Sequence, residues 1–178
     1  MNRVKWAEKK ANNLLESLNI NQIPIPVNEI AQKLNIKISY EPFEGDLSGV
    51  LYRDNSHTII GVNSNESDKR QRFTIAHELG HFILHEGEQL HVDHNFKVNF
   101  RDSVSSQGAK LAEIEANAFA ASLLMPESLV REAYETTILN GVDPFTDDHS
   151  EEVDLLAKLF NVSQTAMLIR LGKLGLLV

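Results

Sequence analysis

The sequence feature that most restricts how this chain can fold is His77-Glu78-Leu79-Gly80-His81, which lies inside a stretch that is apolar on nearly every side. Residues four apart project from one face of an α-helix, so the imidazoles of His77 and His81 can reach one metal ion. The apolar neighbours predict a buried helix, and they are Phe73, Ile75, Ala76, Leu79, Phe82, Ile83 and Leu84. Buried polar side chains need partners. A metal ion supplies them better than the alternative, a pair of histidines with ordinary hydrogen bonds on an amphipathic helix.

The chemistry that this spacing serves is metal-assisted hydrolysis. Zinc accepts imidazole and carboxylate ligands, and a catalytic zinc keeps one position for water beside three protein ligands. Glu78 follows the first histidine directly, a place at which the carboxylate stays off the metal and lies next to that water. It can accept the proton of the water and later deliver it to the leaving amine. The motif therefore predicts a zinc-dependent peptidase with one Zn²⁺ ion, His77 and His81 as ligands and Glu78 as general base.

The third ligand is expected from a second helix, at residues 109–125. At 100° per residue its apolar face includes Ala116 and Ala120, and Glu113 lies on that face or at its edge. Glu115 points to the far side, so we expect Glu113 to bind the metal and Glu115 to be a surface residue. The reverse assignment, with Glu115 as the ligand, stays open. Asn117, one turn after Glu113, is placed to hydrogen-bond a ligand histidine.

Three further histidines follow within 13 residues of the motif. His85 lies one turn after His81, and we expect it to pack beside the metal ligands or to hydrogen-bond one of them. His91 and His94 fall in the polar segment 87–108, where a solvated loop is the simplest expectation. That segment is a candidate lid over the site.

Composition narrows the class of protein further. The 178 residues match the size of one globular domain, and we expect a single domain over 1–178. The absence of cysteine excludes disulfides and cysteine-rich zinc sites. A net charge of −8 suits neither the phosphate backbone of nucleic acids nor an anionic membrane. Neither a signal peptide nor an apolar run long enough to span a membrane is recognisable, so we expect a cytoplasmic protein.

Hydrophobic periodicity predicts an α+β chain in which helices predominate. Helices are expected at 4–18, 27–34, 67–85, 109–125, 151–160 and 163–171, and strands at 36–40, 48–52 and 58–62. The last two strands form a hairpin. Within the polar segment, residues 95–101 alternate as in a strand, and residues 103–108 are expected to be mobile. The final helices, within 150–178, resemble a helix-turn-helix with its turn at Asn161-Val162-Ser163.

The two helical motifs together resemble the ImmA/IrrE family of metallo-endopeptidases. The first is His-Glu-Leu-Gly-His within 72–85, and the second is Glu-x-Glu-Ala-Asn-x-Phe-Ala-Ala-x-Leu-Leu-Met-Pro at 113–126. The similarity also includes segments 26–31, 47–49 and 162–176. It implies a zincin-like fold, in which a small antiparallel or mixed sheet packs on the active-site helix. It also implies site-specific cleavage of a helix-turn-helix transcriptional repressor, encoded nearby on a mobile element or in a stress-response operon.

The substrate is expected to bind in extended form along the 48–62 hairpin, at Ser48, Gly49 and Val50. An exposed strand edge beside the metal helix would supply main-chain hydrogen bonds, and this expectation rests partly on the resemblance. A further side chain should polarise the carbonyl of the bond that is cleaved. Tyr52, Tyr134 and His149 remain as alternatives for that role.

Two other functions compete with peptide hydrolysis. The first is a peptidase-like module that binds a partner without cleaving it, as part of a repressor pair or a toxin–antitoxin pair. The second is DNA binding by the helix-turn-helix region. Its second helix offers little positive charge beyond Arg170 and Lys173, and the apolar run that includes Met167, Leu168 and Ile169 favours packing against the catalytic core. We therefore expect a protein partner and no direct contact with nucleic acid.

Overall fold

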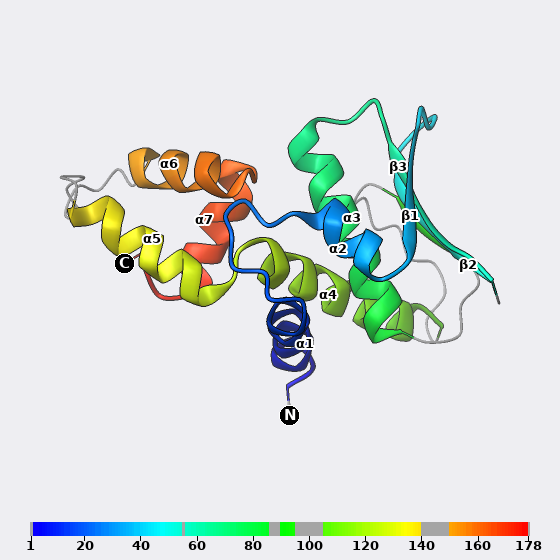
Figure 1. Cartoon of the computed structure of the whole chain (residues 1–178), viewed down its shortest axis with the longest axis horizontal. Coiled ribbons are helices and arrows are strands. Elements are labelled where there is room, and N and C mark those ends of the chain that lie inside the picture. Colours follow the sequence, from blue (N-terminus) through cyan, green and yellow to red (C-terminus); the bar gives the residue numbers. More distant parts are fainter. Residues whose placement is uncertain (1, 55, 86–89, 95–104, 140–149, 178) are drawn as a thin grey trace.

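Figure 1 shows the computed structural model of the chain, which describes residues 2–54, 56–85, 90–94, 105–139 and 150–177. The helices are α1 (Arg3–Ser17), α2 (Val27–Lys33), α3 (Asp68–Leu84), α4 (Ser105–Leu124), α5 (Glu127–Leu139), α6 (Ser150–Phe160) and α7 (Gln164–Lys173). The strands are β1 (Ile36–Glu41), β2 (Leu47–Arg53), β3 (Thr58–Asn63) and β4 (Leu90–His94). The sheet lies at one end of the molecule and α5, α6 and α7 at the other, with α3 and α4 between them (Figure 1).

The sheet is mixed, with the strand order β1-β3-β2-β4. β1 runs parallel to β3, whereas β2 runs antiparallel to both of its neighbours. Leu51 of β2 pairs with Ile60 of β3 and with His91 of β4, so the side chains of these three residues share one face of the sheet. Gly49, two residues before Leu51, lies on the same face and against α3. This face therefore covers the helix that carries His77 and His81.

The helical core lies between α1, α3 and α4. On α1 the buried side chains are Ala7, Ala11 and Leu15, which recur every four residues and face α4. On α4 the fully buried side chains include Phe119, Leu123 and Leu124. Small residues on α1 and large ones on α4 allow the two helices to pack closely. In the part of the chain that the structure describes, no helix is both long and apolar enough to cross a membrane.

Most of the predicted elements are present, and the differences fall after the metal-binding helix. α4 begins at Ser105, so part of the segment that was expected to be mobile is helical. A fourth strand, β4, lies within the segment that was expected to be a solvated loop. It exists because β2 offers an unpaired edge at this place. The alternating residues 95–101 lie outside the described part of the chain.

The C-terminal helices pack against the core through only part of the apolar run on the second of them, since Met167 and Leu171 are buried whereas Leu168 and Ile169 are about half exposed. Asn161 adopts a positive φ of 51° at the turn, and the Oγ atom of Ser163 caps α7 by accepting from the amide of Ala166. Arg170 is buried, and its guanidinium donates to the carbonyl of Met125 and to Ser122 Oγ. One of the two cations on this helix thus faces inward, which counts against direct DNA binding.

Candidate metal centre

The first part of the site is the pair of imidazoles on α3. His77 and His81 are one helical turn apart and each is only 3% exposed. Their Nε2 atoms lie 3.0 Å from each other, so both rings direct the same nitrogen at one point. The helix holds them there because every residue from Thr74 to His81 is buried. The sequence predicts this pairing correctly.

The second part is Glu113, which α4 directs at the two histidines. Its carboxylate oxygens lie 3.3 Å from His77 Nε2 and 3.2 Å from His81 Nε2. This approach requires Gly80, because a Cβ atom at that position would lie 3.1 Å from the Cα atom of Ala116 on α4. The missing side chain lets α3 and α4 cross closely enough for a carboxylate on one to meet imidazoles on the other. Glu113 is therefore positioned as the sequence predicts, although its role as a ligand stays a prediction.

The protonation states suit metal binding. Burial lowers the pKa of His81 to about 4, so its imidazole is neutral at pH 7 and offers a lone pair. Burial opposes the ionisation of Glu113, but hydrogen bonds from His77, His81 and His91 outweigh it and hold the pKa of this carboxyl well below its usual range. The neutral imidazole of His81 and the ionised carboxylate of Glu113 are both in the form that binds zinc.

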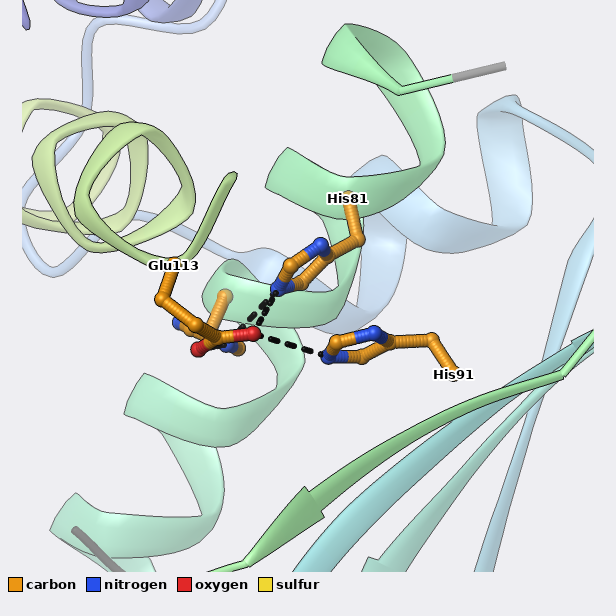
Figure 2. A group of neighbouring side chains, drawn as sticks. His81, His91 and Glu113 are labelled. Carbon is orange, nitrogen blue, oxygen red and sulfur yellow. Dashed lines mark hydrogen bonds and ion pairs between the residues drawn. The ribbon is translucent and has the colours of Figure 1, made fainter. Parts of the chain in front are cut away.

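A third histidine joins the cluster from the sheet. His91 on β4 has its Nε2 atom 3.3 Å from Glu113 Oε1, and its ring stacks on that of His81 with centroids 3.6 Å apart. Figure 2 shows Glu113 pointing from α4 into the space between His81 and His91. The four donor groups of His77, His81, His91 and Glu113 all lie within 4.8 Å of one another. The expectation of a solvated His91 is wrong, because β4 pairs with β2 and turns this side chain inward.

Glu78 lies beside the cluster beneath the sheet. Its side chain is fully buried, one residue after the first ligand candidate. Gly49 on β2 covers it, since a Cβ atom there would lie 3.5 Å from Glu78 Oε1 and only 2.3 Å from Thr74 Cγ2. The glycine thus allows the strand to lie directly over α3. This arrangement confines the carboxylate between α3 and the sheet.

Asn117 orients one of the ligand candidates. Its side-chain oxygen lies 3.1 Å from His77 Nδ1, close enough to accept a hydrogen bond from an N–H at that nitrogen. A proton fixed on Nδ1 leaves the lone pair on Nε2, the atom that faces the cluster. The sequence predicts this contact from the one-turn spacing between Glu113 and Asn117.

A second polar chain reaches His81 from its other side. His81 Nδ1 lies 3.2 Å from His85 Nδ1, and His85 Nε2 lies 3.0 Å from Glu115 Oε2. The guanidinium of Arg3 on α1 binds both oxygens of Glu115, with Nη2 3.2 Å from Oε2. The expectation that Glu115 is a surface residue is wrong, since it is fully buried. Helical phase correctly turns it away from Glu113, but α1 covers that side of α4.

The hairpin does not offer the free edge that substrate binding was expected to use. β4 pairs with β2 along the edge opposite β3, so β2 is an inner strand. Ser48 and Gly49 are buried and Val50 is partly buried. The hydroxyl of Ser48 donates to Glu66 and accepts from Arg70, an interaction within the fold. The edge at Ser48, Gly49 and Val50 is thus occupied by β4, and substrate binding there stays a prediction.

The candidates for polarising a carbonyl lie elsewhere. Tyr52 follows Leu51 on β2, so its side chain projects from the face of the sheet that points away from α3. Tyr134 lies on α5, where burial and the charge of Glu152 on α6 raise its pKa. His149 lies outside the described part of the chain. The group that the structure does bring to the cluster is His91 from β4, and the alternation of Leu90 and Val92 with His91 and Asp93 is the sequence signal that could have indicated the strand.

A mixed sheet laid over a helix with the His-Glu-x-x-His spacing, and a second helix that adds a carboxylate, define a zincin-like metalloprotein. Comparisons with known proteins agree with this class. The IrrE N-terminal-like domain, a peptidase family, matches residues 31–172. The chain therefore belongs to the ImmA/IrrE family of metallopeptidases.

Individual relatives differ in how much of their length is matched. The radiation response metalloprotease IrrE of Deinococcus radiodurans is 36% identical over 83 residues, which are 46% of this chain and 24% of that protein. The metallopeptidase ImmA of Bacillus subtilis is 26% identical over 164 residues, 92% of this chain and 78% of that protein. An immunity region protein of Bacillus phage phi105 is 29% identical and covers 64% of this chain and 72% of its own length.

The fold also recurs among solved structures. A Mycobacterium tuberculosis transcriptional regulator superposes with a TM-score of 0.54 at 18% sequence identity. The match covers 96% of this chain and 47% of that protein. At this level of identity the likeness concerns the fold alone. Nearly the whole of this chain thus superposes on about half of the Mycobacterium tuberculosis protein.

Proposed function

We propose that this protein is a zinc-dependent endopeptidase whose metal is held by His77, His81 and Glu113. The observation that carries the proposal is the convergence of these three donors, with Glu78 buried beside them. Two imidazoles and one carboxylate that meet at one point are the ligand set of many catalytic zinc sites. The donor set suits zinc better than magnesium or calcium, which prefer oxygen ligands.

Catalysis would divide between the metal and the side chains around it. When bound, zinc supplies a Lewis acid that makes water acidic and polarises a peptide carbonyl. Glu78 accepts a proton on its carboxylate and passes it to the leaving nitrogen. Asn117 keeps His77 in the tautomer that presents Nε2. The cover of β2 over α3 excludes bulk water from Glu78, which strengthens these interactions.

A helix-turn-helix transcriptional repressor is the proposed substrate, and the cytoplasm the proposed site of cleavage. Support comes from the relatives, which include a protein of a phage immunity region and the metallopeptidase ImmA. The net charge of −8 argues for a protein substrate over nucleic acid.

A groove beside the cluster could bind a substrate side chain. It has a volume of about 430 Å³ and lies between α3, α4 and α7. Its lining includes Phe73 and Asn117, both of which contact His77. Its walls are mostly apolar, and they include Ala121, Leu124, Met125, Val162, Ala166 and Ile169, while Lys69, Arg70 and Lys173 also line it. This lining fits an apolar side chain with an acidic neighbour.

Substituting glutamate for Ile169 is expected to lower kcat/KM by about fivefold to tenfold, because it places charge where an apolar group would bind. Leu168→Glu is the matched control, since Leu168 is adjacent and exposed to a similar degree (49% against 54%) but does not line the groove. Metal content should not change in either variant. Steady-state kinetics on the cleaved repressor measure the effect. Equal losses of kcat/KM in both variants would show that the groove does not bind the substrate.

Incubation with repressors encoded near this gene, with and without a chelator, tests the function itself. The expected result is a single cleavage, seen as two product masses, that disappears with the chelator and returns with Zn²⁺. Metal analysis should give one equivalent at pH 7 and above, where neutral imidazoles are available. Tight binding of a repressor without products would favour the peptidase-like binding module. Absence of bound metal across that pH range would rule out both the cofactor and the mechanism.

A further inference from the structure

β4 makes two contacts that a substrate would also need to make. Its backbone pairs antiparallel with β2, with Val92 opposite Val50 and His91 opposite Leu51. Its His91 side chain reaches the point on which His77, His81 and Glu113 converge. An extended peptide bound for cleavage would likewise pair with the strand above α3 and present a polar atom to that point. β4 therefore stands where a substrate would lie.

The number of metal-binding donors at the cluster also indicates whether β4 blocks the place of a substrate. Catalytic zinc sites keep three protein ligands and an open position, whereas sites with four protein ligands are closed. His91 has the atom and the approach of a fourth ligand, since its Nε2 lies 3.3 Å from Glu113 Oε1 and its ring stacks on His81. The side chain is 16% exposed, so the protein, and not the solvent, surrounds most of it. With His91 bound, no position would remain for water or for a carbonyl oxygen.

We propose that His91 is a fourth, displaceable metal ligand and that β4 is a built-in inhibitor of the site. This inference rests on the proposed peptidase function and concerns its regulation. A protein substrate would displace β4 from β2 and take over its main-chain hydrogen bonds, and His91 would leave with the strand. The free edge of β2 that the sequence predicts would then exist only in the open form. Small metal-binding molecules would meet a closed site in the resting protein.

The cobalt-substituted protein tests this inference, because the visible spectrum of Co²⁺ responds to a change of ligands. Acetohydroxamate is the probe, since it binds an open metal position directly. The wild-type spectrum should stay unchanged at acetohydroxamate concentrations that convert half of the His91→Ala variant. If the open form is about one-hundredth of the population, the apparent affinity should rise roughly 100-fold on substitution. His91→Ala should also bind Co²⁺ more weakly, having lost one ligand. The control is His57→Ala, an exposed histidine on the β2–β3 connection.

Two proline variants separate the strand from the histidine. Neighbouring residues of a strand direct their N–H groups to opposite sides, so either Val92→Pro or Asp93→Pro removes a hydrogen bond to β2. The proline variant that loses this hydrogen bond should let acetohydroxamate bind the metal although His91 is still present. The inference is overturned if wild type and His91→Ala bind the probe equally, or if both proline variants leave the site closed. Failure of the wild type to bind Co²⁺ would instead reject the metal site, and with it the proposed function.

Discussion

Replacing Glu78 by glutamine is expected to leave the metal content nearly intact and to lower the cleavage rate by roughly 10²–10⁴-fold. Glutamine has the size of glutamate and fits the space between α3 and Gly49 of β2. Its amide can keep hydrogen bonds but cannot accept a proton from water. The measurement is the cleavage rate at saturating repressor, together with metal analysis of the same sample.

Glu135→Gln is the control for this substitution, because Glu135 is exposed on α5 and should behave as wild type. A Glu78→Gln variant that keeps more than about a hundredth of the wild-type rate would exclude the general-base role. The same variant also separates the two proposed activities. A protein that acts only by binding its partner would lose nothing when this carboxylate is replaced.

The second large effect concerns the two glutamates of α4. Replacing Glu113 should reduce metal affinity, whereas replacing Glu115 should reduce the stability of the fold. Glu113→Ala is expected to weaken metal binding by more than the roughly 10–100-fold typical of a residue that only orients a ligand. Glu115→Ala should destabilise the fold by about 1–2 kcal/mol, because His85 loses a buried hydrogen-bond partner. The half-exposed Arg3 can turn into solvent, which limits that cost. Metal titration and thermal unfolding in the presence of a chelator distinguish the two.

A double-mutant cycle with Arg3→Ala provides the control for Glu115. If the ion pair is formed, Glu115→Ala should cost less in the Arg3→Ala background than in the wild type. Additive effects would mean that the two side chains do not interact. A Glu115 variant that loses its metal as completely as Glu113→Ala would reverse the ligand assignment.

The parts of the site that could be predicted are those encoded within one helix. The four-residue spacing of His77 and His81 and the helical phase of Glu113 and Asn117 follow from 3.6 residues per turn, whatever surrounds the helix. The sequence therefore predicts both faces that meet at the cluster. Which helix covers the opposite face of α4 depends instead on the tertiary fold, and this is why Glu115 was assigned to the surface.

His91 was not predicted, although Leu90 and Val92 alternate with His91 and Asp93 as in a short strand. The segment around it is polar, and β4 forms because β2 has an edge to pair with. Such pairing between segments far apart in the sequence is not visible in hydrophobic periodicity. The free edge predicted for Ser48 to Val50 failed for the same reason, since the strand that occupies it comes from a segment that looked irregular.

The buried guanidinium of Arg170 has a consequence for how the molecule comes apart. It joins α7 to the end of α4 through Met125 and Ser122, and α4 also carries Glu113. Opening α7 alone would take Arg170 away from the carbonyl of Met125 and from Ser122 Oγ, and it would expose Met167 and Leu171, which are fully buried. We therefore expect residues 1–178 to behave as one cooperative unit. In hydrogen exchange, the amides of α7 would then report on the same global event as those of the metal-binding helices, although the segment 150–178 resembles a separate module in sequence.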